Sequence, residues 1–246
     1  MRLAVGGVRG TVTAWDATGA AAGEMATGGP VHALEAADLD GDGTDELLVG
    51  SDDAHIYALS ADLTEIWRRE IEFMKQTWGW WTLGTSKVRR IYADDITGDG
   101  TPELLLGVGN MRLHCLDATG EELWRFRTDH GICTTITTAD FFGDGRNLVM
   151  AGNGLTSSAG TLWMLDAAGE LVKRYHNGSW CTALPAIAVG DLDGDGVMTA
   201  FAGNNRGDVR AWAPDSEYTV PLWANNLTRP IRSLTVLPGA VAVGSD

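Results

Sequence analysis

The sequence predicts an all-β fold, namely a β-propeller made of four-stranded blades, and three observations lead to this prediction. An aspartate-rich phrase recurs along the chain and begins at Asp38, Asp95, Asp140 and Asp191. Each copy runs into a short hydrophobic segment that ends in a glycine, and these four glycines lie 45 to 57 residues apart. The segments in between alternate apolar and polar residues, are separated by Gly/Asp-rich turns, and contain no stretch of helical periodicity.

The repeat from Pro30 to Glu70 shows how one blade is predicted. It contains four alternating runs, and a propeller blade has four antiparallel strands. The predicted strands are Val31–Ala37, Glu46–Gly50, His55–Leu59 and Thr64–Arg68. In several other repeats the third run ends in the phrase Asp-Ala-Thr-Gly or a close variant. This phrase predicts a turn, because the aspartate bonds its own backbone and the glycine supplies a positive φ.

Extended to the whole chain, this reading predicts a single domain, residues 1–246, of about five to six blades with incomplete blades at both ends. Complete blades are expected at about 30–70, 88–128, 132–175 and 183–223, and partial blades at 1–29 and 229–246. Three arrangements stay open: a five-bladed ring with one spare strand, a part of a larger ring, and open ends that pair with another chain. The last arrangement would give self-association through unpaired strand edges.

The aspartate-rich phrases predict Ca²⁺ sites. In the pattern DxDxDGxx(D/E), residues 1, 3, 5 and 9 offer side-chain oxygens, residue 7 offers a carbonyl oxygen, and the glycine at position 6 permits a sharp turn. Oxygen ligands of this kind favour Ca²⁺ over softer metals. The predicted ligands are Asp38, Asp40, Asp42, Thr44 and Glu46 in the first loop, Asp95, Thr97, Asp99, Thr101 and Glu103 in the second, and Asp191, Asp193, Asp195 and Val197 in the fourth.

The loops differ in how complete they are. The third loop, which begins at Asp140, has Phe142 and Leu148 at positions 3 and 9, so its site is predicted to be lost. The fourth loop has Thr199 at position 9 and is expected to bind more weakly. The alternative interpretation is that these stretches are only polar turns. Where Ca²⁺ binds, it is expected to hold strands together rather than to take part in chemistry.

These motifs resemble two known kinds of repeat and cover nearly the whole chain. The DxDxDGxx(D/E) loops resemble the FG-GAP/VCBS repeats of integrin-α-like propellers, and the Leu-Asp-Ala-Thr-Gly phrases are similar to the repeats of pyrroloquinoline-quinone-type propellers. The resemblance implies a calcium-binding propeller whose loops lie opposite the usual ligand entrance. It gives no site for the quinone cofactor, and it leaves the function open because propellers host enzymes, lectins and scaffolds.

The amino-acid composition limits the classes of molecule that this protein is expected to bind. The formal net charge is −15, which argues against nucleic acid and anionic membrane surfaces because both need a positive footprint. No apolar stretch approaches the roughly 18 residues of a membrane span. Met1-Arg2 runs directly into a strand-like segment, so no signal peptide is visible. Calcium loops of this kind favour millimolar Ca²⁺, which nevertheless indicates an extracellular or cell-surface location.

A ligand is expected where the longest repeat carries its extra residues, between Glu70 and Lys87. This insert contains Trp78, Trp80 and Trp81. Alignment of the first strands on their acidic loops places five residues at equivalent positions near the channel: His32, Arg89, Thr134, Pro185 and Arg232. Tryptophan and arginine together suit a glycan, through stacking and bidentate carboxylate bonds. The alternative is that the tryptophans pack the insert and the arginines pair with aspartates.

The sequence therefore predicts a calcium-stabilised binding module for a glycan or another extracellular ligand, at a mouth formed by Trp78, Trp80, Trp81, Arg89, Arg232 and His32. Two alternatives remain. The first is an enzyme resembling a polysaccharide lyase, in which His32 and the basic residues Lys87, Arg89 and Arg90 would abstract a proton from a uronic acid. The second is a scaffold that assembles through open blade edges. No catalytic set can be assigned from residue spacing.

Overall fold

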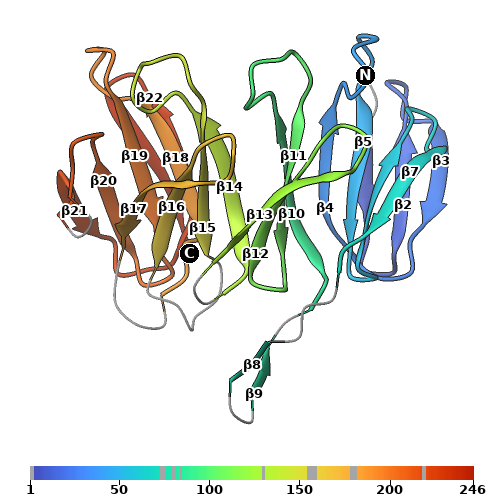
Figure 1. Ribbon diagram of the computed structural model, residues 1–246, viewed down its shortest axis with the longest axis horizontal. Coiled ribbons are helices and arrows are strands. Elements are labelled where there is room, and N and C mark those ends of the chain that lie inside the picture. The colour runs from blue at the N-terminus through green and yellow to red at the C-terminus, as the bar shows by residue number, and fades with distance from the viewer. Residues whose placement is uncertain are drawn as a thin grey trace. The chain divides into compact units, whose positions relative to one another are not determined.

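A computed structural model describes residues 3–72, 76–78, 81–83, 85–128, 131–153, 160–177, 182–217 and 220–246, and for 76–78 and 81–83 it describes the backbone alone. The chain divides into two compact units, Met1–Arg127 and Thr128–Asp246, and each is described by itself. The described residues form strands and turns and contain no helix (Figure 1).

The first unit contains a three-stranded sheet, two four-stranded sheets and a small hairpin, and in each the strand order follows the chain. The three-stranded sheet consists of β1 (Leu3–Gly6), β2 (Thr11–Trp15) and β3 (Ala21–Ala26). The next consists of β4 (Val31–Ala37), β5 (Glu46–Ser51), β6 (His55–Leu59) and β7 (Glu65–Glu70). The other consists of β10 (Val88–Asp94), β11 (Glu103–Val108), β12 (Arg112–Leu116) and β13 (Glu122–Arg127).

The second unit repeats this arrangement, again with antiparallel neighbours in chain order. One four-stranded sheet consists of β14 (Cys133–Ala139), β15 (Leu148–Asn153), β16 (Thr161–Leu165) and β17 (Leu171–His176). The other consists of β18 (Ala186–Asp191), β19 (Met198–Gly203), β20 (Asp208–Trp212) and β21 (Trp223–Asn226). A two-stranded sheet consists of β22 (Ile231–Leu237) and β23 (Ala240–Ser245).

The predicted strands of the repeat 30–70 agree with β4 to β7 to within two residues at each end. The insert after β7 is assigned no strands from the sequence. It contains a separate hairpin of β8 (Gln76–Trp78) and β9 (Trp81–Leu83), in which Trp78 pairs with Trp81 (Figure 1). Short-range alternation in this segment was too weak to predict the hairpin from the sequence.

The hydrophobic core lies between neighbouring sheets. In β6, Ile56 and Ala58 contact the sheet β10–β13, whereas Tyr57 and Leu59 contact the sheet β1–β3. Successive side chains of a strand point to opposite faces, so both faces of the sheet β4–β7 are covered. In the second unit a corresponding core between the sheets β14–β17 and β18–β21 contains Tyr175, whose ring stacks on that of Trp212 at 5.2 Å.

The repeated glycine at the end of each second strand is required by this packing between sheets. A Cβ atom added to Gly50 would lie 2.7 Å from Cγ1 of Val88, the first residue of the next first strand. In the second unit, a Cβ atom at Gly203 would overlap Ile231 in the same way. The glycines therefore let the first strand of one sheet approach the second strand of its neighbour.

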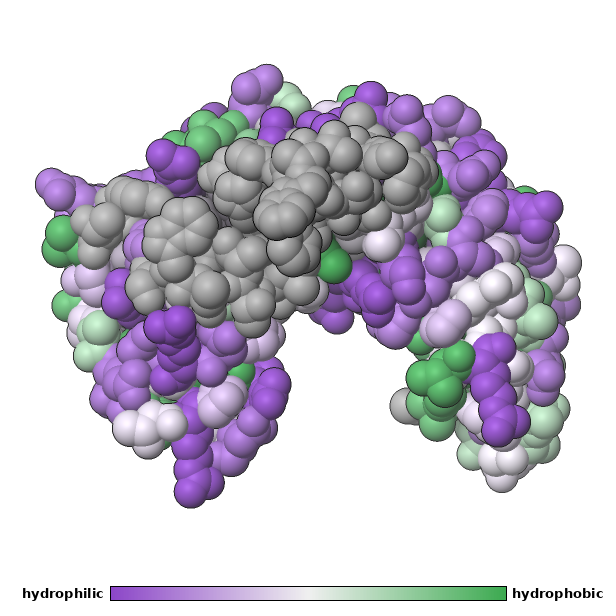
Figure 2. Space-filling model, turned by 90° about the horizontal axis from the view of Figure 1, so that it is seen from below, coloured by the Kyte–Doolittle hydropathy of each residue, from purple (hydrophilic) through white to green (hydrophobic). Residues whose placement is uncertain are grey.

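The exposed apolar side chains are dispersed over several strands and turns, among them Ile66, Leu123, Val172 and Leu222. Figure 2 shows the coloured surface of one face, which is mostly hydrophilic and carries hydrophobic residues in small separate groups. Scattered apolar residues of this kind are normal on protein surfaces. Within the described residues, no helix is long and apolar enough to cross a membrane.

Candidate functional site

The first acidic loop, residues 38–46, connects β4 and β5 and is organised by its own carboxylates. Asp38 accepts the backbone N–H of Gly41 through Oδ1 at 2.8 Å and that of Gly43 through Oδ2 at 2.9 Å. Both glycines have positive φ, 76° and 86°, which lets the chain curl around Asp38. Oxygens of Asp38, Asp40 and Asp42 lie within 4.8 Å of one another. Three acidic groups at such distances repel each other unless a cation joins them.

The glutamate at position 9 is held inside the loop. Glu46 is 7% exposed, and its Oε2 accepts the backbone N–H of Leu39 at 2.9 Å. The equivalent Glu103 of the second loop is 4% exposed and accepts the backbone N–H of Ile96 at 3.0 Å. Burial raises the pKa of the Glu103 carboxyl, and hydrogen bonds from Ile96 and Thr97 offset this effect only in part. A bound cation would favour its charged form.

The second and fourth loops keep the same backbone arrangement with different side chains. In the second, Asp95 accepts three backbone N–H groups between Gly98 and Gly100, and the Thr97 hydroxyl donates to Glu103 Oε1 at 3.2 Å. In the fourth, oxygens of Asp191, Asp193 and Asp195 lie within 4.8 Å of one another.

Position 7 is alike in these three loops. Each residue there donates its backbone N–H to the preceding aspartate, at 2.7 Å for Thr44 to Asp42, 2.8 Å for Thr101 to Asp99 and 2.8 Å for Val197 to Asp195.

The third loop carries its own positive charge. Asp140 accepts the backbone N–H groups of Asp144 and Gly145, so the backbone curls as in the other loops. At position 7, however, Arg146 binds Asp144 through Nε at 3.1 Å and Nη2 at 2.5 Å. Phe142 and Leu148 supply no oxygen at positions 3 and 9. In the third loop Arg146 neutralises the aspartate at position 5. In the first and fourth loops the aspartate at that position lies close to two other carboxylates instead.

The aligned first-strand residues are placed by β-bulges. In β4, Val31 pairs with Ser51 and Ala33 with Gly50, so His32 is the extra residue. Arg89, Thr134 and Arg232 are the extra residues of β10, β14 and β22 in the same way. Bulges redirect a side chain out of the regular sheet alternation and are common beside functional sites. Pro185 differs, because β18 begins after it at Ala186 and pairs with β19 without a shift in register.

Two of these bulge residues meet around a carboxylate in the first unit. Asp52 follows β5, and its backbone N–H donates to the Pro30 carbonyl at 2.8 Å. Lys87 Nζ donates to Asp52 Oδ2 at 2.8 Å, and Arg89 Nη2 lies 3.5 Å from Oδ1. His32 Nε2 lies 3.2 Å from Oδ1 and 2.9 Å from Arg89 Nη1. We name these four residues, His32, Asp52, Lys87 and Arg89, the bulge cluster.

The electrostatics of the bulge cluster are governed by Asp52, whose side chain is 10% exposed. Burial by itself would raise the pKa of the Asp52 carboxyl, but Lys87, Arg89 and His32 outweigh it and lower the pKa. Oδ1 is nevertheless buried and forms no hydrogen bond with any described residue. Nearby on β4, burial raises the pKa of Glu35 against an opposing effect of Arg90. The cluster thus combines two fixed positive charges, one carboxylate and an imidazole.

The remaining residues of the predicted mouth lie outside the described side chains or in the second unit. Trp80 lies outside the described residues, and the side chains of Trp78 and Trp81 do as well. Arg232 belongs to the second unit, where it binds Asp246 through Nε at 2.8 Å and Nη2 at 2.5 Å. The expectation that arginines pair with nearby aspartates therefore holds for Arg89 and Arg232, while their role in ligand binding stays a prediction.

Sequence reasoning missed Asp52. The alternating pattern predicts a turn between β5 and β6, but it does not distinguish Asp52 from the other residues of that turn. A signal existed in the repetition of Gly-Ser-Asp, which stands at Gly50–Asp52 and again at Gly244–Asp246. In both places the aspartate pairs with the bulge residue of the first strand beside it.

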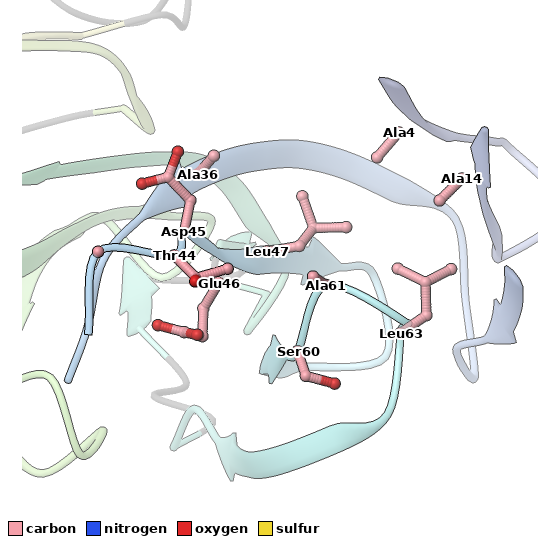
Figure 3. Close-up of a pocket in the computed structure, with 11 residues that line it drawn as sticks. Ala4, Ala14, Ala36, Thr44, Asp45, Glu46, Leu47, Ser60, Ala61 and Leu63 are labelled. Carbon is pink, nitrogen blue, oxygen red and sulfur yellow. The ribbon is translucent and has the colours of Figure 1, made fainter. Parts of the chain in front are cut away.

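A cavity of about 490 Å³ also lies in the first unit, between the sheets β1–β3 and β4–β7. Its apolar wall includes Ala4, Ala14, Leu47 and Leu63, and residues 43–46 of the first acidic loop form its edge (Figure 3). The alanines leave room because they are small. The cavity adjoins the loop end of the sheets, whereas the bulge cluster lies at the opposite ends of β4 and β5.

Comparisons with known proteins identify the fold. A family model described as the lambda-carrageenase β-propeller domain matches residues 74–187. The Dos1 propeller aligns with a TM-score of 0.72 at 15% identity, over 100% of this chain and 62% of that chain. BBS1N in complex with ARL6DN aligns with a TM-score of 0.65 at 9% identity, over 98% and 71%. The fold is that of a β-propeller.

A third solved structure, BamB from Moraxella catarrhalis, aligns with a TM-score of 0.52 at 17% identity, over 98% of this chain and 78% of that chain. At such identities the likeness concerns the fold alone. The chain spans 62% of the length of the Dos1 propeller. A comparison with curated proteins gives no match.

Proposed function

We propose that this propeller is a Ca²⁺-stabilised binding module that takes an anionic glycan at the bulge cluster. The observation that carries the proposal is the convergence of His32, Lys87 and Arg89 on one side of the first unit. On a chain of net charge −15, a local excess of positive charge is unusual and suits a sulfate or carboxylate group.

The family match supports a glycan as the ligand. A lambda-carrageenase is named for the polysaccharide lambda-carrageenan, and the match covers the insert from residue 74 on, including its three tryptophans, together with Lys87 and Arg89. Tryptophan faces stack on sugar rings, while arginine recognises the attached anionic group. BBS1N, solved in complex with ARL6DN, indicates that a propeller can also dock a protein, which is the competing kind of ligand.

The acidic loops support Ca²⁺ as the stabilising ion. The sets 38–42 and 191–195 each bring three carboxylates within 4.8 Å, and in the second loop the charge of Asp99 acts on the buried Glu103. All the candidate donors are oxygens, which Ca²⁺ prefers. The resemblance of these loops to FG-GAP/VCBS repeats points to the same ion. Ca²⁺ would neutralise the carboxylates of these three loops and join the first and second strands that each of them connects.

Two measurements test the proposal. After a chelator has removed Ca²⁺ from the protein, isothermal titration with CaCl₂ should show saturable binding. Thermal melts should give a higher melting temperature in CaCl₂ than in chelator, and MgCl₂ serves as the control ion. An array of sulfated, uronate-containing and neutral polysaccharides should show binding to anionic members, and Arg89→Ala should weaken it about tenfold. If the unaltered chain and Arg89→Ala bind neutral and anionic polysaccharides equally well, the bulge cluster is not the binding site.

A polysaccharide-degrading enzyme is a second candidate, favoured by the carrageenase match and by the contact of His32 with Arg89 at 2.9 Å. In a lyase, an imidazole near an arginine can abstract the proton next to a carboxylate that the arginine neutralises. Ultraviolet absorbance on incubation with polyuronates detects the unsaturated product of such a lyase. New reducing ends released from λ-carrageenan would instead indicate hydrolysis.

A further inference from the structure

The bulge cluster contains a conflict in its hydrogen bonds. A guanidinium can only donate, so Arg89 Nη1, 2.9 Å from His32 Nε2, can form a hydrogen bond with that nitrogen only when it carries no proton. The same Nε2 lies 3.2 Å from Asp52 Oδ1, which is also an acceptor. Nε2 can accept from Arg89 or donate to Asp52, but it cannot do both at once. Oδ1 is buried and forms no hydrogen bond with the described residues.

Such a conflict is unusual, because buried polar atoms in native proteins are nearly always hydrogen-bonded. The Arg232–Asp246 pair of the second unit shows the satisfied alternative, in which one arginine and one carboxylate form two parallel hydrogen bonds. In the bulge cluster, one carboxylate is instead shared by Lys87, Arg89 and His32. The bulge cluster therefore carries a net positive charge. The Arg89 guanidinium also lacks the two parallel hydrogen bonds to a carboxylate that Arg232 forms.

An anionic oxygen from a ligand would resolve the conflict. It would take the Arg89 donors that now face His32, and the imidazole could then carry its proton on Nε2 and donate to Asp52 Oδ1. Every group in the cluster would have a partner in that state. The charge of Asp52 acts against this gain, because Lys87 and Arg89 must give up their ion pairs with Asp52 before they can bind the anionic group of a ligand.

We propose that Asp52 is a built-in competitor for the anionic group of the ligand and sets the affinity of the bulge cluster for sulfate- or carboxylate-bearing glycans. This inference rests on the proposed glycan-binding function. It assigns to Asp52 a role in specificity, because the competing carboxylate leaves neutral ligands unaffected and makes anionic ligands displace an existing ion pair.

The test compares three variants by isothermal titration in saturating CaCl₂. The probes are a λ-carrageenan oligosaccharide, an oligogalacturonate and neutral dextran, so that the arms separate sulfate from carboxylate. Asp52→Asn should bind both anionic probes about fivefold more tightly than the unaltered chain. Asp62→Asn makes the same change in net charge in the β6–β7 turn, where Asp62 bonds Ser60 and Thr64, and should change nothing. Arg89→Ala should weaken both anionic probes.

The outcomes separate this inference from the function on which it rests. If Asp52→Asn keeps the melting temperature of the unaltered chain but binds no more tightly than Asp62→Asn, Asp52 is not a competitor, although Arg89→Ala can still show that the site exists. If the unaltered chain and Asp52→Asn both fail to bind either anionic probe, the proposed function itself is wrong.

A second measurement needs no variant that must fold. In the unaltered chain labelled with ¹⁵N-histidine, saturation with the bound oligosaccharide should move the nitrogen resonance of His32 Nε2, because the ligand takes the Arg89 donor that faces this atom. An Nε2 resonance that stays in place when the oligosaccharide saturates the protein contradicts the proposal.

Discussion

The first and third acidic loops share one backbone arrangement but balance their charge differently. In both loops the first aspartate, Asp38 or Asp140, accepts two backbone N–H groups from the residues that follow. In the first loop three carboxylates then face one another. In the third loop Arg146 neutralises Asp144, and positions 3 and 9 are apolar.

This comparison separates two roles within the motif. The aspartate at position 1 and the glycines shape the turn whether or not an ion is present, because the third loop keeps them without the full ligand set. Positions 3, 7 and 9 distinguish a loop suited to a cation from one that supplies its own counter-charge. A motif match at positions 1, 5 and 6 alone therefore indicates a turn and carries no prediction of metal binding.

The largest effect is expected from giving the third loop a carboxylate at position 9. Leu148 is 5% exposed and packs in the core with Met150 and Leu162. Leu148→Glu should lower the free energy of unfolding by about 3 kcal/mol, because it buries a charge without a partner. Urea unfolding followed by circular dichroism measures the loss, and Leu148→Met is the control of similar volume.

The same variant can be turned into a test of the comparison. Ca²⁺ should not rescue Leu148→Glu, since Phe142 and Arg146 still occupy positions 3 and 7. In the triple variant Phe142→Asp, Arg146→Thr, Leu148→Glu, Ca²⁺ should restore much of the lost stability. Equal behaviour of the single and triple variants in Ca²⁺ would show that these positions do not decide cation binding.

A smaller effect is expected from removing the aspartate at position 1. In chelator, Asp38→Ala and Asp140→Ala should each lower the free energy of unfolding by about 1.5 kcal/mol, because each change removes two hydrogen bonds to a charged acceptor in an exposed loop. In Ca²⁺, Asp38→Ala should lose more than Asp140→Ala. Thermal melts in both buffers measure the difference, and a harmless Asp140→Ala would contradict the structural role of position 1.

The sequence predicted the strands and loops because both repeat with a period set by backbone geometry. Alternation placed β4 to β7, and the glycine spacing reflects the close contact between Gly50 and Val88. Alignment on the acidic loops even placed His32 and Arg89 at equivalent positions. The bulges that redirect these side chains could not be predicted, since a bulge depends on the register of a strand pair rather than on either strand alone.

The centre of the bulge cluster was beyond sequence reasoning for a related reason. Asp52 lies in a turn rich in Asp and Ser, where such residues are common for local reasons. Its importance comes from contacts with Lys87 and Arg89, which follow it by 35 residues or more. Burial of its Oδ1 likewise depends on tertiary packing. Local patterns identify turns, whereas a shared counter-ion is visible only in three dimensions.

The smallest effect concerns the counter-charge of the third loop. The hydrogen bond from Arg146 lowers the pKa of Asp144 below its ordinary value. A lowered pKa in the folded state stabilises the protein above the unfolded pKa, and this contribution is lost as the pH falls through the folded pKa. Arg146→Ala should therefore raise the Asp144 midpoint, measured by NMR titration of its carboxyl carbon, and slightly reduce stability at neutral pH but not in strong acid.

Two controls make this last titration a direct test of the comparison. Arg146→Lys keeps the charge but not the two-pronged contact, so its Asp144 midpoint should fall between those of the other two forms. Added Ca²⁺ should leave the midpoint of the unaltered chain unchanged, because Arg146 already neutralises Asp144, whereas Arg146→Ala opens that carboxylate to the ion. A midpoint in the unaltered chain that falls further on adding Ca²⁺ would mean that the third loop binds the ion despite its arginine, and the distinction between the two loops would then be one of affinity only.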